Sequence, residues 1–448
     1  MNVDVLDTPW KDAILLELRV AEIIRDQAKY GWVLDVDLCN KHIEELNGLI
    51  DATDAELIPL TRPRVIRDSE VSAPFTKSGR LATRVSNYYQ DAAPTVRGPF
   101  TKVQFESINL GSTTQVKEYL YSIGWEPDEW NYDPVTKEKK SPKLTTTSLL
   151  KLGRVGELLD HRTVLVHRRN QLQGFVENVR PDGRIEARAN PLGTNTCRMT
   201  HSIVVNVPKA KDEVFFGRQM RSVFTCPDDC VLVDYDAKGL ENRVFAHYLN
   251  DPKLTELILE GDWHTYIWNF IKEFVSVRSV SKNVYYALLY GAGDSQLGKT
   301  ADITPPGYTK ATAGAAIRER IMAGLPAFAA LNDTVRRQAG SGYVVGLDGR
   351  RVRIRSEYSA LNTLFQSAGS IIMKRAAVTL DDWIKSAKLP AHKVGDFHDE
   401  GVLEVVKGYE EPVKMLCVEA VKFAGKYYNL NCPLDSDAQH GKRWSEIH

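Results

Sequence analysis

Two short strand-like segments, each ending near a carboxylate, constrain the fold of this chain more than any other feature. Residues 230–236, CVLVDYD, are a mostly apolar run that ends at Asp236 and leads into the helical pattern GLENRVFAHYL. Residues 392–406, HKVGDFHDEGVLEVV, are two β-rich runs around a polar core and predict a hairpin with Asp399 at its bend. A sheet that joined both segments would bring the two aspartates together.

Two aspartates held in this way suit phosphoryl transfer. Transfer onto a 3′-hydroxyl needs carboxylates that hold two Mg²⁺ ions roughly 4 Å apart. One ion lowers the pKa of the attacking hydroxyl, and both stabilise the in-line displacement. Spacing alone leaves an alternative open, because structural aspartates at both places would give the same pattern.

Most of the remaining chain has a helical pattern. Over residues 11–30 apolar side chains recur at intervals of three and four, and Gly31 follows as a stop signal. Residues 61–105 are instead rich in Pro, Gly, Thr and Arg, which predicts loops and short strands. A second helical pattern precedes this stretch, at about 37–57, and three follow it, at about 112–123, 149–161 and 250–361.

Composition excludes several classes of protein. A chain of 448 residues is expected to form two or three lobes, and its 43% hydrophobic and 26% charged residues are those of a soluble globular protein. No run approaches the ~18 apolar residues of a membrane span, so we expect a cytoplasmic protein. Six scattered cysteines predict reduced thiols, although the CPDDC segment at 226–230 could seed a zinc site.

Charge is segregated along a chain that is neutral overall, with 58 basic and 58 acidic residues. Residues 1–60 carry 5 basic and 13 acidic side chains, a net charge of −8. Residues 151–224 carry 13 and 7, a net charge of +6, and residues 331–375 carry 8 and 3, a net charge of +5. This distribution predicts a positive stripe suited to a phosphate-binding groove, although a solvated charged face is an equal alternative.

The segment RSVSKNVYYALLYG bears on whether the two aspartates serve phosphoryl transfer or are structural. Its residues Arg278, Lys282, Tyr286 and Tyr290 follow one another at intervals of four, so on a helix they form one ridge. The two cations suit a triphosphate, and the two aromatic rings suit a sugar and a base. A solvated basic turn followed by core tyrosines is the alternative.

Taken in order, these segments resemble the motifs of family A DNA polymerases, and most closely those of the replicative polymerases of short-tailed bacteriophages. The resemblance covers residues 110–448 well and the first helices weakly. It rests on DAKGLENRVFAH from Asp236, the segment from Arg278 to Gly291, HDE from His398, CRMTH at 197–201, GDWHT at 261–265, LDGRRVRIRS at 347–356, NTLFQSAG at 362–369 and the terminal WSEIH.

The resemblance implies a metal site and an order of roles around it. Asp236 and Asp399 would hold two Mg²⁺ ions, for which Mn²⁺ can substitute, together with the Ala237 carbonyl. Glu400 would support them electrostatically. Asp234 is not the counterpart, because only Asp236 lies five residues before a glutamate, Glu241.

The remaining roles concern the nucleotide and the DNA. The incoming triphosphate would be contacted by Arg278, Lys282 and His264. The templating base would be flanked by Tyr290 and Gly291, and the space beneath the deoxyribose would be closed by Glu241 and Tyr286. Primer and template would be read through the minor groove by Arg198, Asn362 and Gln366, with His398 near the primer end.

The implied architecture is an α/β protein of the α+β type with the right-hand polymerase fold. We expect a helical thumb over 1–188 with an insertion at about 61–105, a palm with an antiparallel sheet over 189–249 and 362–448, and helical fingers over 250–361. Phage relatives bind thioredoxin as a processivity factor through an insertion at the same place. A loop that grips duplex DNA is at least as good an interpretation of this shorter, basic insert.

A proofreading exonuclease domain is not expected in this chain, since the thumb-like helices begin within about ten residues of Met1. Proofreading would then reside on a separate polypeptide, have been removed from a longer chain, or be absent. Primer-template DNA and dNTPs are the implied partners, in the host cytoplasm if the protein is encoded by a phage.

Two departures and one misleading match accompany the resemblance. Val205 stands in place of a glutamine that would touch the template, and Tyr358 stands where bacterial relatives have an arginine. GDSQLGKT at 293–300 fits the phosphate-loop pattern, but it follows a helix rather than a strand. The rivals of a DNA polymerase are a single-subunit RNA polymerase, which would not be expected to keep Glu241, and a non-catalytic nucleic-acid-binding protein, which would be expected to lose a metal ligand.

Overall fold

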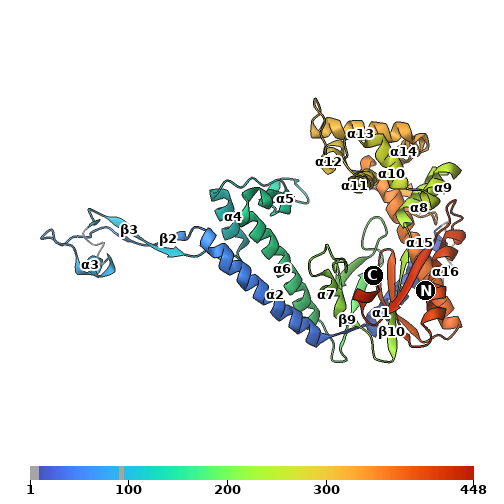
Figure 1. The fold of residues 1–448 in the computed structure, drawn as a ribbon, viewed down its shortest axis with the longest axis horizontal. Coiled ribbons are helices and arrows are strands. Elements are labelled where there is room, and N and C mark those ends of the chain that lie inside the picture. Colours follow the sequence, from blue (N-terminus) through green and yellow to red (C-terminus); the bar gives the residue numbers. More distant parts are fainter. Residues whose placement is uncertain (1–9, 90–94, 448) are drawn as a thin grey trace. The chain divides into compact units, whose positions relative to one another are not determined.

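The structure is a computed structural model that describes residues 10–89 and 95–447. Residues 1–9, 90–94 and 448 lie outside the described residues, and with them the final histidine of the WSEIH motif. The chain divides into two compact units (Figure 1). The larger unit comprises Met1–Cys39 and Gly174–His448, and the smaller unit comprises Asn40–Gln173.

A four-stranded antiparallel sheet forms the centre of the larger unit. Its strands run in the order β13-β14-β10-β15. The predicted strand is β10, and the predicted hairpin is β13 with β14, so both predictions are confirmed. The bounds of the four strands are Cys230–Ala237 for β10, Ala391–Phe397 for β13, Glu400–Val406 for β14 and Ser436–Gly441 for β15.

Both faces of this sheet are covered. Successive side chains of a strand point to opposite faces. Val233 and Tyr235 belong to the main core, together with residues of α15 (Ala360–Ser386) and α16 (Glu410–Tyr427). The other face carries Glu400, to which the buried indole of Trp444 donates a hydrogen bond.

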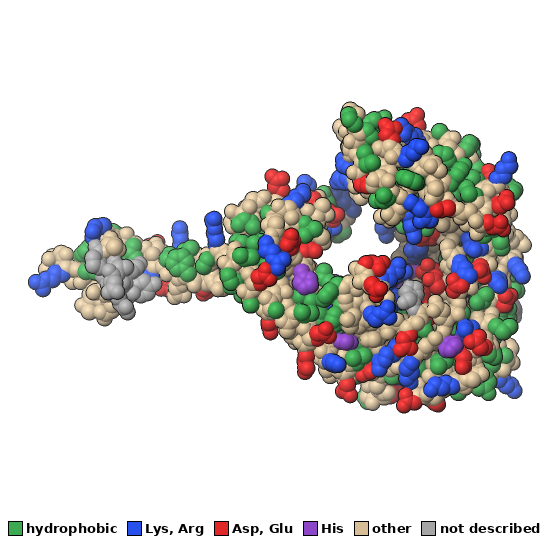
Figure 2. All heavy atoms as spheres, viewed as in Figure 1, with side chains coloured by type: hydrophobic (Ala, Val, Ile, Leu, Met, Phe, Trp, Pro, Cys, Tyr) green, Lys and Arg blue, Asp and Glu red, His purple; other side chains and the backbone are tan. Residues whose placement is uncertain are grey.

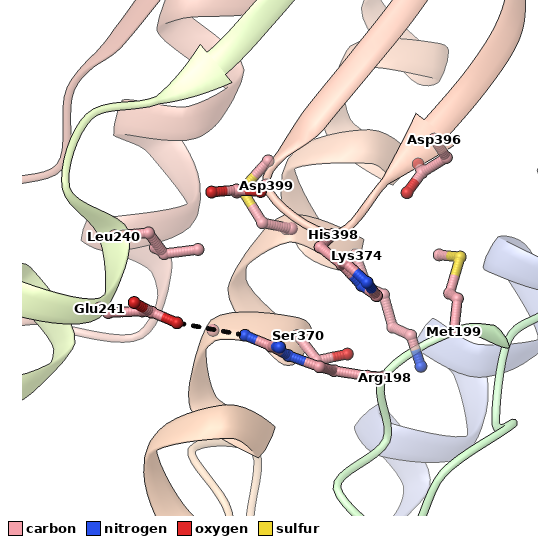
Figure 3. A pocket seen from close by; sticks show the side chains of 11 residues that line it. Arg198, Met199, Leu240, Glu241, Ser370, Lys374, Asp396, His398 and Asp399 are labelled. Carbon is pink, nitrogen blue, oxygen red and sulfur yellow. Dashed lines mark ion pairs between the residues drawn. The ribbon is translucent and has the colours of Figure 1, made fainter. Parts of the chain in front are cut away.

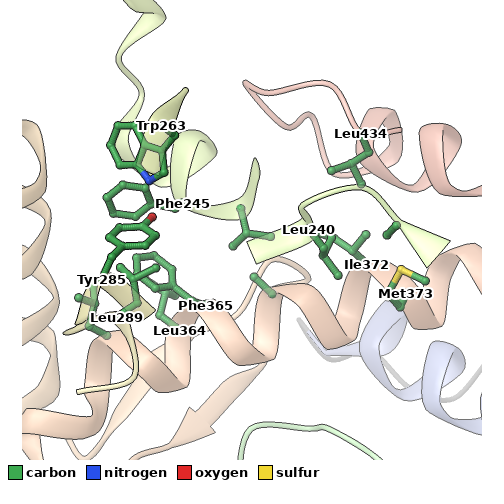
Figure 4. Packing of buried hydrophobic residues seen from close by; sticks show 14 of the residues in the cluster. Leu240, Phe245, Trp263, Tyr285, Leu289, Leu364, Phe365, Ile372, Met373 and Leu434 are labelled. Carbon is green, nitrogen blue, oxygen red and sulfur yellow. The ribbon is translucent and has the colours of Figure 1, made fainter. Parts of the chain in front are cut away.

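The long helix α15 is the hub of the larger unit. It packs against α1 (Lys11–Tyr30), α8 (Leu240–Leu249), α14 (Pro326–Ala339) and α16. Figure 4 shows its residues Leu364 and Phe365 beside Phe245 of α8. The ring of Phe245 lies 5.7 Å from that of Phe365 and 5.9 Å from that of Tyr285, both edge-on. Helices from distant parts of the sequence therefore share one core.

The helix-rich block predicted for 250–361 is present in the larger unit. Its helices are α9 (Pro252–Glu260), α10 (Trp263–Ile271), α11 (Arg278–Leu289), α12 (Asp294–Thr300), α13 (Lys310–Gly324) and α14, followed by the two-stranded pair β11 (Tyr343–Val345) and β12 (Arg351–Arg353). Shorter elements of this unit are β1 (Trp32–Leu34), β6 (Arg184–Ile185), β7 (Ala187–Asn190), β8 (Thr200–Ile203), α7 (Gly217–Ser222) and β9 (Phe224–Thr225).

The segment that resembles a phosphate loop is a helix. Residues 294–300 form α12, which packs closely on α13. A Cβ atom at Gly298 would lie 1.7 Å from the carbonyl oxygen of Lys310, and one at Gly314 would lie 1.8 Å from that of Asp294. Gly298 thus permits the close approach of two helices, and the segment has no loop that could surround a phosphate.

The smaller unit is a helical body with a β-ribbon. Its core contains Leu57, Val116, Leu120, Leu149 and Leu158. Its elements are α2 (Val36–Leu57), β2 (Arg64–Val71), α3 (Thr83–Tyr89), β3 (Phe100–Glu106), α4 (Thr113–Ser122), β4 (Trp130–Tyr132), β5 (Lys139–Pro142), α5 (Thr146–Leu149) and α6 (Arg154–Glu177).

Two predictions for this part of the chain were incomplete. Short strands within 61–105 are confirmed as β2 and β3, but the segment also contains the helix α3. The helix predicted to end at His161 continues to Glu177, because Leu165, Leu172 and Phe175 extend its buried stripe through a polar sequence.

The helix α1, which we expected within a thumb over 1–188, belongs to the larger unit because it packs on α15.

A buried ionic cluster anchors α1. The carboxylate of Glu17 accepts hydrogen bonds from the ammonium of Lys374 at 2.7 and 2.8 Å and from the guanidinium of Arg350. Lys374 also donates to the carbonyl of Pro191 at 2.8 Å, and its side chain is only 1% exposed. Burial lowers the pKa of Lys374, and Glu17 opposes that shift.

Replacing Glu17 with Ala should therefore destabilise the protein strongly. The change leaves two buried cations without their shared carboxylate, which costs about 3 to 5 kcal/mol for a broken buried pair. Urea unfolding followed by circular dichroism would measure the loss. Glu22→Ala is the matched control on the same helix, because its partner Arg19 is partly exposed and keeps Asp381 and Asp382. Equal effects of the two changes would contradict the role given to Glu17.

Candidate active site

The pairing of β10 with β14 brings the two predicted metal aspartates to one end of the sheet. Asp236 lies directly opposite Glu400 in the register of the two strands. Asp399 occupies the turn before β14, and its carbonyl oxygen accepts a hydrogen bond from the amide of Ala237 at 3.1 Å. Asp236 is half-buried and Asp399 is exposed. The carboxyl group on the turn is therefore open to a ligand at the place where β10 ends.

Other carboxylates near this end of the sheet are held by cations. Asp437 of β15 lies opposite Asp236, and its carboxylate is 2.7 Å from the ammonium of Lys238. Asp396 of β13 forms a buried ion pair with Lys393. Asp234 is 3% exposed, so its side chain lies inside the protein.

Glu400 is fixed from two sides. Its carboxylate accepts a hydrogen bond from the indole nitrogen of Trp444 at 2.8 Å and lies 3.4 Å from the guanidinium of Arg221. Arg221 in turn lies 4.0 Å from the centre of the Trp444 ring. Burial lowers the pKa of Arg221, which Glu400 and Asp234 oppose. All three side chains are buried, so Glu400 is a fixed charge beside Asp399.

A small pocket next to Asp399 collects several residues expected to contact DNA or nucleotide. Figure 3 shows Arg198, Glu241 and His398 around it, with Ser370 of α15 at its base. Arg198 lies 3.5 Å from Glu241, which also accepts a hydrogen bond from the hydroxyl of Tyr290. Glu241 therefore joins a residue of the CRMTH segment to the end of α11.

The first turns of α15 carry further polar side chains that were predicted to contact DNA. Asn362 and Gln366 are half-buried and lie one turn apart on the helix. The Oδ1 atom of Asn362 is buried and has no hydrogen-bond partner among the described residues. Ser370 donates to the carbonyl of Cys197 at 2.6 Å and so holds the segment that carries Arg198.

The predicted ridge lies on α11, with Tyr290 as its C-cap. Arg278 is held by Asp262, the N-cap of α10, at 2.8 Å, and its hydrogen bonds lower the pKa of that carboxyl group. Lys282 is exposed. The ring of Tyr286 lies 5.8 Å from that of His264 and 6.1 Å from that of Tyr290.

Burial and nearby charges shift the pKa of two residues at this ridge, Tyr286 and His264. Burial, and to a smaller extent Glu241, raises the pKa of Tyr286 to about 12. Burial lowers the pKa of His264, and the cations of Lys282 and Arg278 act in the same direction. The Nδ1 atom of His264 is buried without a partner among the described residues. Near neutral pH, Tyr286 keeps its proton and the ridge offers cations only at Arg278 and Lys282.

Comparison with known proteins identifies the family. The family model described as DNA polymerase family A matches residues 81–446. This chain belongs to DNA polymerase family A. The DNA-directed DNA polymerase of Escherichia phage Phieco32 is 27% identical, over 97% of this chain and 98% of that protein. The DNA-directed DNA polymerase of Escherichia phage T7 is 26% identical, over 98% of this chain and 70% of that protein.

A solved structure shows the same fold. It is the polymerase domain of Pol1 from M. smegmatis in complex with DNA primer-template and dNTP, with a TM-score of 0.73 and 20% identity over 96% of this chain and 70% of that one. The α+β architecture expected from the sequence is confirmed. This family A member is a DNA-directed DNA polymerase, and neither the RNA polymerase nor the non-catalytic alternative is favoured.

Family A polymerases use metal ions, primer-template DNA and dNTPs. Among the described residues of this one, no group of three or more His, Cys, Asp or Glu side chains is arranged to hold a metal ion. All six cysteines are buried and free, and burial raises the thiol pKa of Cys226 and Cys230 to about 11. Over the part of the chain that is described, no helix has the length and hydropathy of a membrane span.

Several residues near the site were not found from the sequence. Lys238, Arg221 and Trp444 pair with acidic side chains that are distant in the chain, so no local pattern marks them. Trp444 lies in the WSEIH segment, which the resemblance included without a role. The ion pair of Lys393 with Asp396 is three residues apart within one strand and could have been noticed.

The arrangement around Glu400 generates a prediction for this polymerase. Glu400→Gln keeps an acceptor for Trp444 but removes the charge beside buried Arg221, so stability should fall by about 1.5 to 3 kcal/mol. Nucleotide addition should keep more than about a tenth of its rate, because this carboxylate is bound to protein groups. Urea unfolding and single-turnover primer extension measure the two effects. Glu411→Gln, at an exposed ion pair, should change neither. Complete loss of extension without a loss of stability would mean that Glu400 contacts metal directly.

Proposed function

We propose that Asp236 and Asp399, with the Ala237 carbonyl, hold two Mg²⁺ ions, for which Mn²⁺ can substitute. The observation that carries the proposal is the pairing of β10 with β14, because Asp236 of β10 and Asp399, on the turn before β14, then lie at one end of the sheet. Mg²⁺ commonly binds through one or two carboxylates with water and substrate phosphates, so a site with few protein ligands fits it. When bound, the ions would activate the primer hydroxyl and stabilise charge on the phosphoryl group.

The reaction would join the 3′-oxygen of the primer to the α-phosphorus of a dNTP. The bond from that phosphorus to the bridging oxygen breaks, pyrophosphate leaves, and the hydroxyl proton passes to solvent. Arg278 and Lys282 would bind the triphosphate, with His264 as a neutral hydrogen-bonding group. Since Arg278 is paired with Asp262, a triphosphate would have to replace that carboxylate.

DNA would be bound by Arg198 and His398, which line the pocket in Figure 3, and by residues in the first turns of α15. Arg198, Asn362 and Gln366 would contact the minor groove, where the acceptors recur in every correct pair. His398 would lie at the primer end, and Tyr290 with Gly291 would flank the templating base. The unpartnered Oδ1 of Asn362 supports this assignment.

Removal of a metal ligand should separate catalysis from binding. Asp236→Asn or Asp399→Asn should lower single-turnover nucleotide addition more than about a hundredfold while duplex affinity changes little, because phosphate contacts supply most of the affinity. Asp234→Asn is the neighbouring control and should be comparatively mild. Retention of more than about a hundredth of the wild-type rate by Asp236→Asn would exclude Asp236 as a ligand.

Selection of the sugar should depend on Glu241 and Tyr286. We propose that these side chains close the space beneath the deoxyribose, so that a ribose hydroxyl would displace a hydrogen-bonded carboxylate. The bond from Tyr290 to Glu241 and the half-buried position of Tyr286 support this arrangement. Ribonucleotides should therefore be rejected.

The hydroxyl of Tyr286 should also determine the use of dideoxynucleotides. Wild type should accept them nearly as well as dNTPs, because on this proposal the hydroxyl would lie near the place of the substrate's own 3′-oxygen. Tyr286→Phe should discriminate against them about a hundredfold, or about 2.7 kcal/mol. Competitive single-nucleotide incorporation measures both enzymes. The same dideoxy-to-deoxy ratio in the two enzymes would show that Tyr286 does not lie under the sugar.

The ribbon of β2 and β3 is a candidate processivity element. We propose that thioredoxin, or else duplex DNA directly, binds this basic insertion. Figure 2 shows Lys and Arg side chains at several places along it. Arg67, Lys77 and Arg80 are exposed, and none of them has an ion-pair partner among the described residues. Val65 and Phe105 pair across the two strands and are 59% and 70% exposed.

Processivity should distinguish the two partners of the ribbon. If thioredoxin binds, its addition should lengthen products under single-turnover trapping, and Phe105→Ser should abolish the effect. If DNA binds, Arg67→Ala combined with Lys77→Ala should shorten the products made without thioredoxin. The slope of log affinity against log salt concentration should also fall by the amount expected for the loss of about two phosphate contacts. Lys139→Ala combined with Lys140→Ala, on exposed β5, is the control. If product lengths are unchanged in every case, the ribbon has no role in processivity.

A further inference from the structure

The two cations proposed to bind the triphosphate differ in their protein contacts. Arg278, in the first turn of α11, donates three hydrogen bonds to the carboxylate of Asp262, at 2.8, 2.9 and 3.0 Å. Lys282, one turn later, is exposed and has no ion-pair partner among the described residues. One of the two cations is therefore already paired with a carboxylate of the protein.

The contact between Arg278 and Asp262 resembles the binding of a phosphate group. Its hydrogen bonds come from Nε and Nη2 of the guanidinium and reach both carboxylate oxygens. Guanidinium groups bind phosphate oxygens in the same fork geometry. A carboxylate and a phosphate can therefore compete for one edge of Arg278.

Asp262 is held in place for this contact by the start of α10. As the N-cap of that helix, it accepts a hydrogen bond from the backbone amide of Thr265 at 3.1 Å and another from the Thr265 hydroxyl at 2.7 Å. Hydrogen bonds from Arg278 and Thr265 lower the pKa of its carboxyl group, so the group is charged near neutral pH. Over residues 10–89 and 95–447, Arg278 has no other ion-pair partner. Its charge is thus balanced by Asp262.

Water reaches both partners of this ion pair. The side chain of Arg278 is 49% exposed and that of Asp262 is 48% exposed. Ion pairs exposed to this degree contribute little to stability, because water screens their attraction. Opening the pair therefore costs little. A triphosphate, which has more charge and more acceptor oxygens than one carboxylate, can take the place of Asp262.

We propose that Asp262 sets the affinity of the active site for nucleotides by competing with their phosphates for Arg278. The inference rests on the proposed function, in which Arg278 binds the triphosphate. When a binding group is free for only a fraction of the time, the apparent affinity falls by that fraction. Both the dNTP and the pyrophosphate product are bound less tightly for this reason. Release of pyrophosphate is favoured, since Asp262 returns to Arg278 as the product leaves.

A carboxylate that stays on Arg278 and orients it toward the nucleotide is the opposite arrangement. In that case Asp262 and the phosphates would share one guanidinium, and neighbouring like charges repel. The geometry therefore favours exchange over a shared contact. The two arrangements predict opposite effects on nucleotide affinity when the charge of Asp262 is removed.

Asp262→Asn tests the competition. Asparagine is as good an N-cap as aspartate, so α10 should keep its start while the charge beside Arg278 is lost. In single-turnover extension by the full chain, the apparent Kd for the dNTP should fall about two- to fivefold, the range of an exposed ion pair. Inhibition by pyrophosphate should strengthen by the same factor. The maximum rate should hardly change, because ground state and transition state gain the same contact. An unchanged or higher Kd would overturn the proposal.

Two further variants should show whether the effect acts through Arg278. In an Arg278→Ala enzyme, adding Asp262→Asn should no longer tighten dNTP binding. Tightening of the same size in that enzyme would mean that Asp262 repels phosphates directly, and the competition for Arg278 would be wrong. Glu273→Gln is the matched control, because it removes one charge from an exposed pair with Arg320 in the same block of helices and should leave the Kd unchanged.

Failure of the proposed function gives a different result. If Arg278→Ala alone does not weaken dNTP binding, Arg278 is not a ligand of the triphosphate, and the inference fails with that assignment. If Arg278→Ala weakens binding but Asp262→Asn does not tighten it, the competition alone is contradicted.

Discussion

The antiparallel pairing of β10 with β14 is the constraint on which the rest of the catalytic region depends. Their aspartates are separated by more than 160 residues of chain. Closing a loop of that length costs about 4 to 5 kcal/mol in chain entropy, by the logarithmic dependence on loop length. Burial of nearly all of β14 offsets this cost, since α16 packs beside the sheet on one face and Trp444 lies on the other.

The carboxylates at the end of the sheet differ in whether a cationic side chain is paired with them. Glu400, Asp437 and Asp396 each have a cationic partner, whereas Asp399 is exposed and has no ion-pair partner among the described residues. Paired carboxylates repel one another less and attract cations less strongly than open ones. The turn that carries Asp399 is therefore the place at this end of the sheet where a carboxylate is exposed and has no ion-pair partner among the described residues.

The sequence predicted those elements whose pattern is local. The apolar run of β10, the two β-rich runs of the hairpin and the stripe of α1 lie where they were expected, because each pattern reports burial of its own side chains. The extent of α6 was missed, since its polar middle interrupts the stripe. The α+β fold and the family were also correctly predicted, through the order of several motifs.

Local sequence patterns could not predict which charged and polar side chains pair with one another. That Arg278 pairs with Asp262, Glu241 with Tyr290, and Lys374 with Glu17 depends on which helices meet in space. The same limit applies to the roles of the site residues. A resemblance assigns them one by one, while the structure shows which neighbours hold them.

The ionic cluster of Glu17 has a consequence for synthesis of the chain. Glu17 is made long before its partners Arg350 and Lys374, which follow 333 and 357 residues later. At about 5 to 20 residues per second, ribosomal synthesis separates them by roughly 20 to 70 s. During that time α1 has no α15 to cover Leu16, Val20 and Ile23. The acidic first segment of the chain would then keep an uncovered apolar stripe in solution until its docking site emerges.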